Sequence, residues 1–332
     1  MRTALCDRLG IELPIVQAPM GGASCPALAA AVSNAGGLGM LALWYYPPEA
    51  VRAAIRETRA LTDRSFGVNL VLTSPQEERL AVCLDEGVPV ISLFWGDPGP
   101  LTARAHAAGA VVTSTVGTAR QAREAVAAGV DVVVAQGWEA GGHVLGEVAT
   151  LPLTRAVVEA VGPVPVVAAG GISDGHGLAA VLALGAAGAW IGTRFLATPE
   201  AAIHPQYRER LLAASEAETV HSRLFDVGWP DAPHRVLRNA TVEAWEAAGR
   251  PARGARPGEG EPVAHGPRGP IPRYASITPM PDMEGDIEAL SMWSGQGVGV
   301  VDEVKPAGEV VREIADEARA VLRGLAERVG AG

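Results

Sequence analysis

The sequence predicts an α/β fold, a closed (β/α)8 barrel of eight parallel strands, from three observations. Eight short runs of apolar and β-branched residues recur along the first 194 residues. Alanine-rich stretches with helical character separate these runs, at intervals of about 20 to 30 residues. Several of these stretches end in glycine before the next run, as in "DEGVPV" and "AAGVDV", where a helix C-cap is expected. Regular alternation of strand and helix implies a parallel sheet, and eight such units imply a barrel.

The expected elements follow directly from this pattern. Strands are predicted at residues 14–19, 37–41, 66–70, 89–94, 110–115, 131–136, 165–170 and 189–194. Helices are predicted between them, at 26–35, 47–62, 118–129, 153–162 and 174–188. A doubly wound open sheet is the alternative fold. Its G-x-G-x-x-G fingerprint is absent after the first strand, where the chain reads "MGGASCP".

The chain changes character after the eighth strand. Residues 205–247 look helical and charged, whereas residues 249–273 hold six glycines, six prolines and five arginines and predict an irregular, exposed segment. The amphipathic stretch 307–329 is a good candidate for the helix that covers the eighth strand. The predicted domains are therefore a barrel (1–204), an inserted and mostly helical cap (205–303), and a C-terminal helix (304–332) that completes the barrel.

Composition excludes several classes of function. The 332 residues are 48% hydrophobic and 19% charged, with a net charge of −10, which is typical of a globular protein and argues against nucleic-acid binding. Apolar stretches are interrupted well before the length of a membrane span, and the charged N-terminus "MRTALCDRLGIELP" is unlike a signal peptide. Three cysteines without metal-type spacing predict reduced thiols in the cytoplasm. The sequence does not determine the oligomeric state and leaves a homodimer open.

Chemistry in such a barrel is expected at the C-terminal ends of the strands, with phosphates at the loops after strands seven and eight. Those two ends read "AAGGISDGHG" and "WIGTRF". Gly170, Gly171 and Gly192 let the backbone approach a phosphate, and Thr193 adds a hydroxyl. Glycines at both positions predict an anionic cofactor there.

The sixth strand ends in "QGWEAGGH", which carries the candidate catalytic residue. Gln136 is expected at the barrel mouth, Gly141 and Gly142 beside a bound ring system, and His143 above it. Histidine is the natural general base near neutral pH. At the same level, Asn69 ends the third strand with an amide and Thr115 ends the fifth with a hydroxyl.

Several motifs in the same order resemble the nitronate monooxygenase family, formerly called 2-nitropropane dioxygenases. They are "PIVQAPMGG", "AAAVSNAGGLGML", "RSFGVNL", "AQGWEAGGH", "PVVAAGGISDGHG", "IGTRFLAT" and the later "SMWSGQGVG". The resemblance covers nearly the whole barrel. It implies an FMN-binding TIM barrel with a mostly helical second domain and no metal.

The resemblance also implies roles for individual residues. His143 matches the family's active-site histidine. FMN contacts are implied from the ends of strands one, three and six, with the phosphate held after strands seven and eight. The implied set is Ala18, Pro19, Met20, Gly21, Asn69, Gln136, Gly141, Gly171, Trp190, Ile191, Gly192 and Thr193. Four residues are expected to bind the substrate: Met20, His143, Trp293 and Gln296. Of these, Trp293 and Gln296 are expected to reach over the site.

The expected function is FMN-dependent oxidation of alkyl nitronates or nitroalkanes by O2, which yields carbonyl compounds and nitrite. FMN-dependent enoyl-acyl-carrier-protein reductases and NADH:quinone reductases share the barrel and a similar E-A-G-G-H element. Those relatives tend to carry G-G-M after strand one, whereas this chain has Ala18, Pro19 and Met20, which favours nitronate oxidation. The alternatives are an NAD(P)H-dependent FMN reductase acting on quinones or enoyl thioesters, and a flavin-binding module without turnover.

Overall fold

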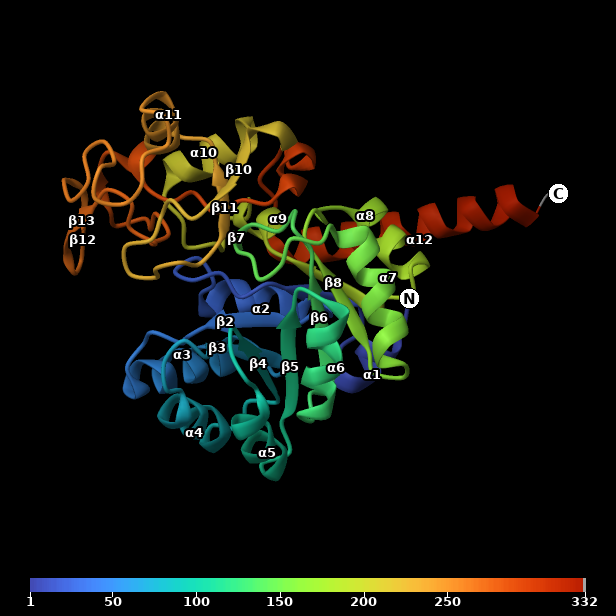
Figure 1. The fold of residues 1–332 in the computed structure, drawn as a ribbon. Coiled ribbons are helices and arrows are strands. Elements are labelled where there is room, and N and C mark those ends of the chain that lie inside the picture. The colour runs from blue at the N-terminus through green and yellow to red at the C-terminus, as the bar shows by residue number, and fades with distance from the viewer. Residues whose placement is uncertain (331–332) are drawn as a thin grey trace.

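The computed structural model describes residues 1–330 and contains the predicted barrel. Eight parallel strands form one sheet in the order β1-β9-β8-β6-β5-β4-β3-β2 (Figure 1). They are β1 (Ile15–Gln17), β2 (Gly39–Ala42), β3 (Phe66–Val71), β4 (Val90–Phe94), β5 (Val111–Val116), β6 (Val132–Gln136), β8 (Val166–Ala169) and β9 (Gly188–Ile191). Each overlaps its predicted range, so the prediction of a (β/α)8 barrel is confirmed.

Hydrogen bonds between the first two strands close the ring. The backbone N–H of Gln17 donates to Leu38 O at 2.9 Å, and the N–H of Leu38 donates to Ile15 O at 2.9 Å. A parallel bridge joins Val16 to Leu38 at the same place. Both edges of the sheet are therefore paired, which removes the exposed edges of an open sheet.

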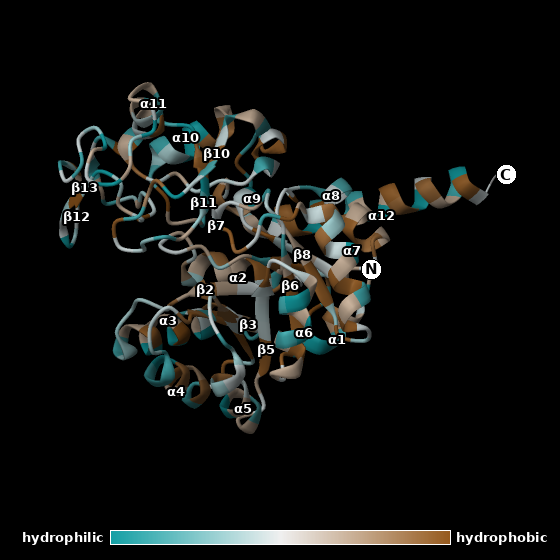
Figure 2. Cartoon of the chain, viewed as in Figure 1, coloured by the Kyte–Doolittle hydropathy of each residue, from teal (hydrophilic) through white to brown (hydrophobic). Residues whose placement is uncertain are grey.

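Seven helices lie between successive strands and around the barrel. They are α2 (Pro26–Asn34), α3 (Pro48–Leu61), α4 (Glu77–Asp85), α5 (Gly99–Ala107), α6 (Ala119–Ala127), α7 (Thr150–Val161) and α8 (Gly175–Ala183). Side chains define where some of them begin: Thr118 accepts from the N–H of Gln121, and Asp174 from that of Gly177. Figure 2 shows hydrophobic residues along β8 and hydrophilic ones on α6, as expected for a core strand and a surface helix.

A short first helix, α1 (Ala4–Leu9), closes the N-terminal end of the barrel. Its Leu5, Cys6 and Leu9 pack with the inward-facing residues of the strands, among them Val16 and Met40. The barrel interior is therefore a filled core, and the space for a ligand lies at the opposite end.

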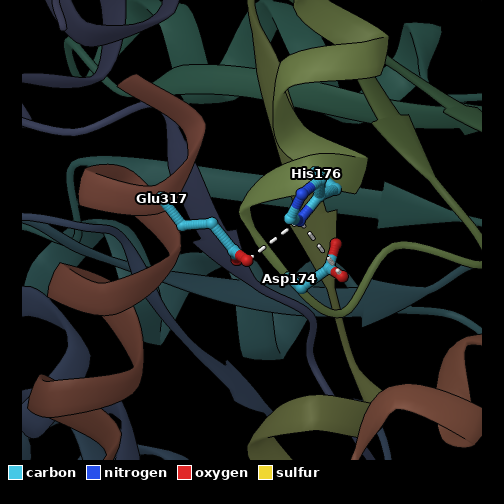
Figure 3. A group of neighbouring side chains, drawn as sticks. All are labelled: Asp174, His176 and Glu317. Carbon is cyan, nitrogen blue, oxygen red and sulfur yellow. Dashed lines mark ion pairs between the residues drawn. The ribbon is translucent and has the colours of Figure 1, made fainter. Parts of the chain in front are cut away.

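The last helix, α12 (Ala307–Gly330), packs against α8 and α2, and its C-terminal part projects beyond the barrel (Figure 1). Figure 3 shows how its Glu317 contacts the start of α8. One oxygen of this carboxylate accepts the N–H of Gly175 at 2.6 Å, and the other lies 2.9 Å from Nδ1 of His176. Together with Asp174 these groups have metal-ligand chemistry, but each carboxylate already accepts a backbone N–H, so we interpret them as a helix cap that joins α12 to α8.

Residues 205–303, called the cap segment from here on, are less helical than expected. They contain α10 (Pro205–Ala213), α11 (Ala240–Ala247) and the 3-10 helices η1 (Glu216–Glu218), η2 (Ile287–Ala289) and η3 (Gln296–Val300). They also contain β10 (Thr219–Ser222) and β11 (His234–Leu237), which form an antiparallel sheet with β7 (Gly142–His143). A second antiparallel sheet consists of β13 (Gly269–Pro272), β12 (Pro262–Gly266) and β14 (Glu284–Gly285).

The region 249–273 corrects a prediction, because part of it is ordered by pairing and burial. Strands β12 and β13 form a hairpin within the stretch that composition assigned to an irregular loop. Arg256 is buried, pairs with Asp226 at 3.0 Å and lies over the ring of Tyr274. The hairpin and the buried arginine were not predicted, because the strands are short and the many prolines normally mark edges and turns.

Two further expectations concern the cysteines and membranes. Cys6, Cys25 and Cys83 are all free thiols, and burial raises the pKa of the Cys83 thiol to about 12. Among residues 1–330, no helix combines the length and the apolar character that crossing a bilayer requires.

Candidate active site

A cavity of about 880 Å³ lies between the C-terminal ends of the barrel strands and the cap segment. It brings together sixteen of the residues selected from the sequence. These are Ala18, Pro19, Met20, Gly21, Asn69, Thr115, Gln136, Gly141, Gly142, His143, Gly170, Gly171, Trp190, Gly192, Thr193 and Trp293. The position of the cavity matches the expectation for an α/β barrel.

Two predicted residues lie elsewhere. Ile191 is fully buried in the core cluster that contains residues of α2, α8 and α12, because successive residues of β9 point to opposite faces and Trp190 takes the inward position. Gln296 does not line the cavity. Its backbone N–H donates to Glu139 O at 2.9 Å, while the neighbouring Gly295 and Gly297 form the wall.

The loops after β8 and β9 form a backbone cradle. Gly170 and Gly171 have φ angles of +109° and +70°, which L-residues rarely adopt. Gly297 approaches so closely that an added Cβ would lie 2.5 Å from Ser173 Oγ and 3.0 Å from the carbonyl carbon of Gly171. The hydroxyl of Ser173 is buried and lines the cavity, and no described residue hydrogen-bonds to it. An orphaned donor beside glycine backbone fits a phosphate, since buried polar groups are normally satisfied.

The electrostatics of the cavity favour an anionic occupant. No aspartate, glutamate or lysine of the described chain lines it, and Arg268 at the tip of the β12–β13 hairpin is its one residue with a fixed charge. Arg268 itself is exposed. A phosphate or a developing anion in this cavity therefore meets no opposing carboxylate, although the protein as a whole carries a net charge of −10.

The "QGWEAGGH" segment is fixed by hydrogen bonds at both ends. The amide Nε2 of Gln136 donates to His143 O at 2.9 Å, and its Oε1 accepts the N–H of Leu145 at 3.0 Å. Gln136 therefore positions the histidine loop as well as facing the cavity. The carboxylate of Glu139 accepts from the backbone N–H and the hydroxyl of Thr150, both at 2.8 Å, at the start of α7.

A buried arginine holds the middle of the same segment. Arg235 of β11 is only 1% exposed, and its guanidinium lies 4.2 Å from the ring centre of Trp138. It donates to Trp138 O at 2.9 and 3.3 Å and to Thr219 Oγ1 at 3.1 Å. Burial lowers the pKa of Arg235 to about 10, which still leaves the group charged at neutral pH. The tryptophan and the carboxylate of the motif are thus structural anchors.

Close packing requires two glycines of the segment, and the backbone angle favours glycine at a third. A Cβ on Gly137 would lie 2.0 Å from Thr150 Oγ1, and one on Gly141 would lie 2.4 Å from the backbone nitrogen of Gly295. Gly142 has a φ of +70°. Because Gly295 belongs to the chain just before η3, the contact at Gly141 packs the barrel loop directly against the cap segment.

His143 is enclosed by aromatic rings. Strand β7 pairs with β11 so that His143 faces His234, with ring centres 5.7 Å apart. The indole of Trp229 stacks on His143 at 3.9 Å and 23°, and Trp293 and Trp95 lie at 5.2 and 6.1 Å. The Nε2 atom is buried and has no hydrogen-bond partner among residues 1–330.

The surroundings of His143 determine its protonation state. Burial first, and the neighbouring His234 second, lower the pKa of His143 to about 3. His234 is itself satisfied, because its Nε2 accepts from the N–H of Phe225 at 3.1 Å and its Nδ1 lies 3.0 Å from Ala232 O. His143 is therefore neutral at neutral pH. Its ring therefore keeps one lone pair that a proton can occupy, although the low pKa makes it a weak base.

Asn69 and Thr115 lie at the strand ends where the sequence predicted them. The Nδ2 group of Asn69 donates to the carbonyl and the hydroxyl of Ser92, both at 3.2 Å, which orients the side-chain amide. Thr115 is half-buried at the end of β5 and lines the cavity.

The sequence analysis missed most of the aromatic lining. Trp44, Tyr45 and Tyr46, in "LWYYPP" directly after β2, all line the cavity, as does Trp229 of the cap segment. Trp95, directly after β4, adopts a φ of +62°, and its ring lies near His143 and Trp229. For the aromatic residues after β2 and for Trp95 after β4, the available signal was their position just after a barrel strand. Nothing local pointed to Trp229.

Fold and site define an oxidoreductase of the TIM-barrel class. The family model for nitronate monooxygenase matches residues 2–78 and 72–317. The chain therefore belongs to the nitronate monooxygenase family, a family of flavin-dependent enzymes.

Several known proteins resemble the chain over nearly its whole length. A relative from Mycobacterium tuberculosis, named (3aS,4S,5R,7aS)-5-hydroxy-7a-methyl-1-oxo-octahydro-1H-indene-4-carboxyl-CoA dehydrogenase, is 36% identical over 95% of both chains. The solved structure of FabK from Thermotoga maritima has a TM-score of 0.83 and 34% identity over 99% of both chains. That of nitroalkane oxidase from Streptomyces ansochromogenes has a TM-score of 0.80 and 34% identity, and covers 97% of this chain and 100% of that one.

Proposed function

We propose that the protein uses FMN to oxidise alkyl nitronates and nitroalkanes with O2, with a carbonyl compound and nitrite as products. The observation that carries this proposal is the neutral, unpartnered Nε2 of His143 in a cavity that also contains a glycine cradle. Such an arrangement suits removal of a proton from a carbon next to a nitro group. Family membership supports it, as does the similarity to the nitroalkane oxidase.

The residues present fit FMN. The phosphate would be held by the backbone at Gly171 and Gly192, with the hydroxyls of Ser173 and Thr193 as further donors. One cradle matches the single phosphate of FMN. The flavin ring would lie over the strand ends, near Met20, Asn69 and Gly141. When bound, the flavin supplies the redox chemistry by accepting an electron from the nitronate and passing it to O2.

The protein itself would supply the base and its surroundings. His143 takes the α-proton of a neutral nitroalkane, and Gln136 and strand β11 hold its backbone in place. Negative charge then develops on the nitro oxygens. Because no carboxylate of residues 1–330 lines the cavity, none of the described residues opposes this charge. A preformed nitronate needs no base.

A second candidate is a flavin enzyme that acts on acyl thioesters with a nicotinamide cofactor. The observation that favours it is the Mycobacterium tuberculosis relative, whose name specifies a carboxyl-CoA substrate and which is 36% identical over 95% of both chains. A flavin-binding module without turnover is the third candidate. Location in the cytoplasm and a homodimeric state remain predictions from the sequence.

Anaerobic flavin spectroscopy distinguishes the three candidates. We expect the purified protein to be yellow and to release FMN on denaturation. We expect its flavin absorbance to bleach with ethyl nitronate and not with NADH or NADPH. Bleaching by a reduced nicotinamide alone would support the thioester enzyme, and no response to either reductant would support the module. Release of FAD, or failure to bind FMN, would contradict the proposal at its first step.

A further inference from the structure

The loop between Asp226 and Pro233 places an aromatic side chain against the proposed base. The indole of Trp229 stacks on the His143 ring with centres 3.9 Å apart and planes 23° apart. Trp229 also lines the cavity, whereas Nε2 of His143 is covered. In this arrangement Trp229 occupies one face of the imidazole and the part of the cavity beside it.

Both ends of this loop are fixed, whereas its middle is held by one long hydrogen bond, from the N–H of Trp229 to Asp226 O at 3.3 Å. At one end, the N–H of Val227 donates to Tyr274 O at 3.1 Å, and Val227 O accepts the N–H of Ser276 at 2.9 Å. At the other end, Pro233 O accepts the N–H of Val144 at 2.9 Å. Between them, residues 228, 230 and 231 are exposed.

The residue before the tryptophan has the properties of a hinge. Gly228 has a φ of +99°, and a Cβ built there would meet nothing within 4 Å. A glycine with free space around it can change its backbone angles without collision. Asp231, three residues further on, also has a positive φ, +58°, so the loop contains two residues in left-handed backbone conformations.

Within residues 1–330, the side chain of Trp229 is held by stacking and edge-on contacts with other rings. Besides His143, its neighbours are Trp95 at 5.4 Å and Trp44 at 6.5 Å, both edge-on. Within residues 1–330, the indole N–H of Trp229 makes no hydrogen bond. By contrast, the indole N–H of Trp245 donates to Pro251 O at 3.0 Å. Moving Trp229 therefore breaks no hydrogen bond of its side chain.

We propose that Trp229 controls access to His143 and thereby determines which substrates reach the base. Turning about Gly228, the indole leaves the imidazole face, and the vacated space admits a nitroalkane whose α-carbon approaches Nε2 in the plane of the ring. Substrates too bulky to fit between Trp95, Trp44 and the displaced indole are excluded. This inference rests on the proposed role of His143, but the position of Trp229 can be tested without turnover.

The first test follows the protonation of His143 by NMR in the FMN-loaded protein. Wild type should keep a neutral imidazole down to a pH of about 3. Trp229→Ala removes the ring that covers one face, so we expect the pKa of His143 to rise by about one unit or more towards its ordinary value. Trp229→Phe keeps a stacking ring and should give a smaller shift in the same direction. Trp245→Ala is the control, because that indole belongs to the cap segment and does not line the cavity.

The second test measures selectivity, as the ratio of kcat/KM for a branched nitronate to that for ethyl nitronate. Trp229→Ala should increase this ratio about tenfold, and Trp245→Ala should leave it unchanged. An unchanged His143 pKa in a folded, FMN-loaded Trp229→Ala protein would overturn the inference. If Trp229→Ala does not fold, an absent shift in Trp229→Phe would overturn it instead. If wild type oxidises no nitronate, the proposed function fails and the titration still decides the position of Trp229.

Discussion

Replacing His143 by asparagine separates proton abstraction from binding. Asparagine keeps a similar volume and a hydrogen-bonding amide but has no titratable nitrogen. Because Nε2 of His143 is unpartnered, its loss leaves no other group unsatisfied, and the fold should survive. FMN should also remain bound, since the cradle at Gly171 and Ser173 belongs to other loops.

The expected magnitude follows from the role assigned to the ring. A positioned base contributes about 10²–10⁴-fold, which corresponds to about 3–5 kcal/mol of transition-state stabilisation. We therefore expect kcat/KM for neutral nitroethane to fall by that factor in His143→Asn. Ethyl nitronate has already lost its α-proton, so its kcat/KM should fall far less. Steady-state O2 consumption with each substrate measures both values, and His265→Asn, an exposed histidine of β12, is the control.

The same variant tests the lowered pKa through stability. A folded-state pKa of about 3, against an ordinary value of 6.5, means that the unfolded chain binds the proton more readily. The contribution of His143 is thus present above pH 6.5 and is lost as the pH falls towards 3. His143→Asn should reduce the slope of unfolding free energy against pH in this window, by at most about 1.4 kcal/mol per unit. Equal losses on nitroethane and ethyl nitronate would refute the role of base, and an unchanged slope would refute the buried neutral state.

Two further predictions concern the cradle and the histidine loop. Gly171→Val should weaken FMN binding at least tenfold, because a cradle contact contributes about 1–3 kcal/mol. The control is Gly87→Val, at a similar φ of +66° in an exposed turn. It should lower stability by a similar amount and leave the FMN dissociation constant unchanged. Equal FMN affinity in both variants, measured by fluorescence titration, would show that the cradle is misassigned. Arg235→Lys cannot reproduce the donors to Trp138 O and Thr219 Oγ1, so it should lower the unfolding free energy by about 2–4 kcal/mol. A denaturation midpoint equal to that of wild type would contradict this role.

The barrel could be predicted because its information is local. Each strand is a short apolar run and each following helix has its own periodicity, so the alternation is visible without any tertiary knowledge. The cradle followed from the same reasoning, since Gly170 and Gly192 come directly after β8 and β9. Ile191 was expected at the cofactor but lies in the core, because the sequence predicts the strand and not which of its residues face inward. That choice depends on register.

The cap segment resisted prediction because its contacts are distant in sequence. Strand β7 has two residues and pairs with β11, about ninety positions later, so neither is recognisable alone. Arg235 appears in the sequence as one charged residue among many, yet its partner is the carbonyl of Trp138. The position of Trp229 at the site likewise becomes evident only from its stack on His143.

The barrel and the cap segment contribute different parts of the site, which gives a physical reason why related barrels can act on different substrates. The barrel loops provide the cradle and His143, whereas the cap provides Trp229 and the hairpin that carries Arg268. The two parts are interlocked where a Cβ on Gly141 would lie 2.4 Å from Gly295 N and where Gln296 N–H donates to Glu139 O. Substitutions in the cap loops can therefore reshape the substrate side, while changes at this junction disturb the cofactor side as well. Comparing substrate range between cap-loop variants and junction variants is thus the most direct route to the substrate.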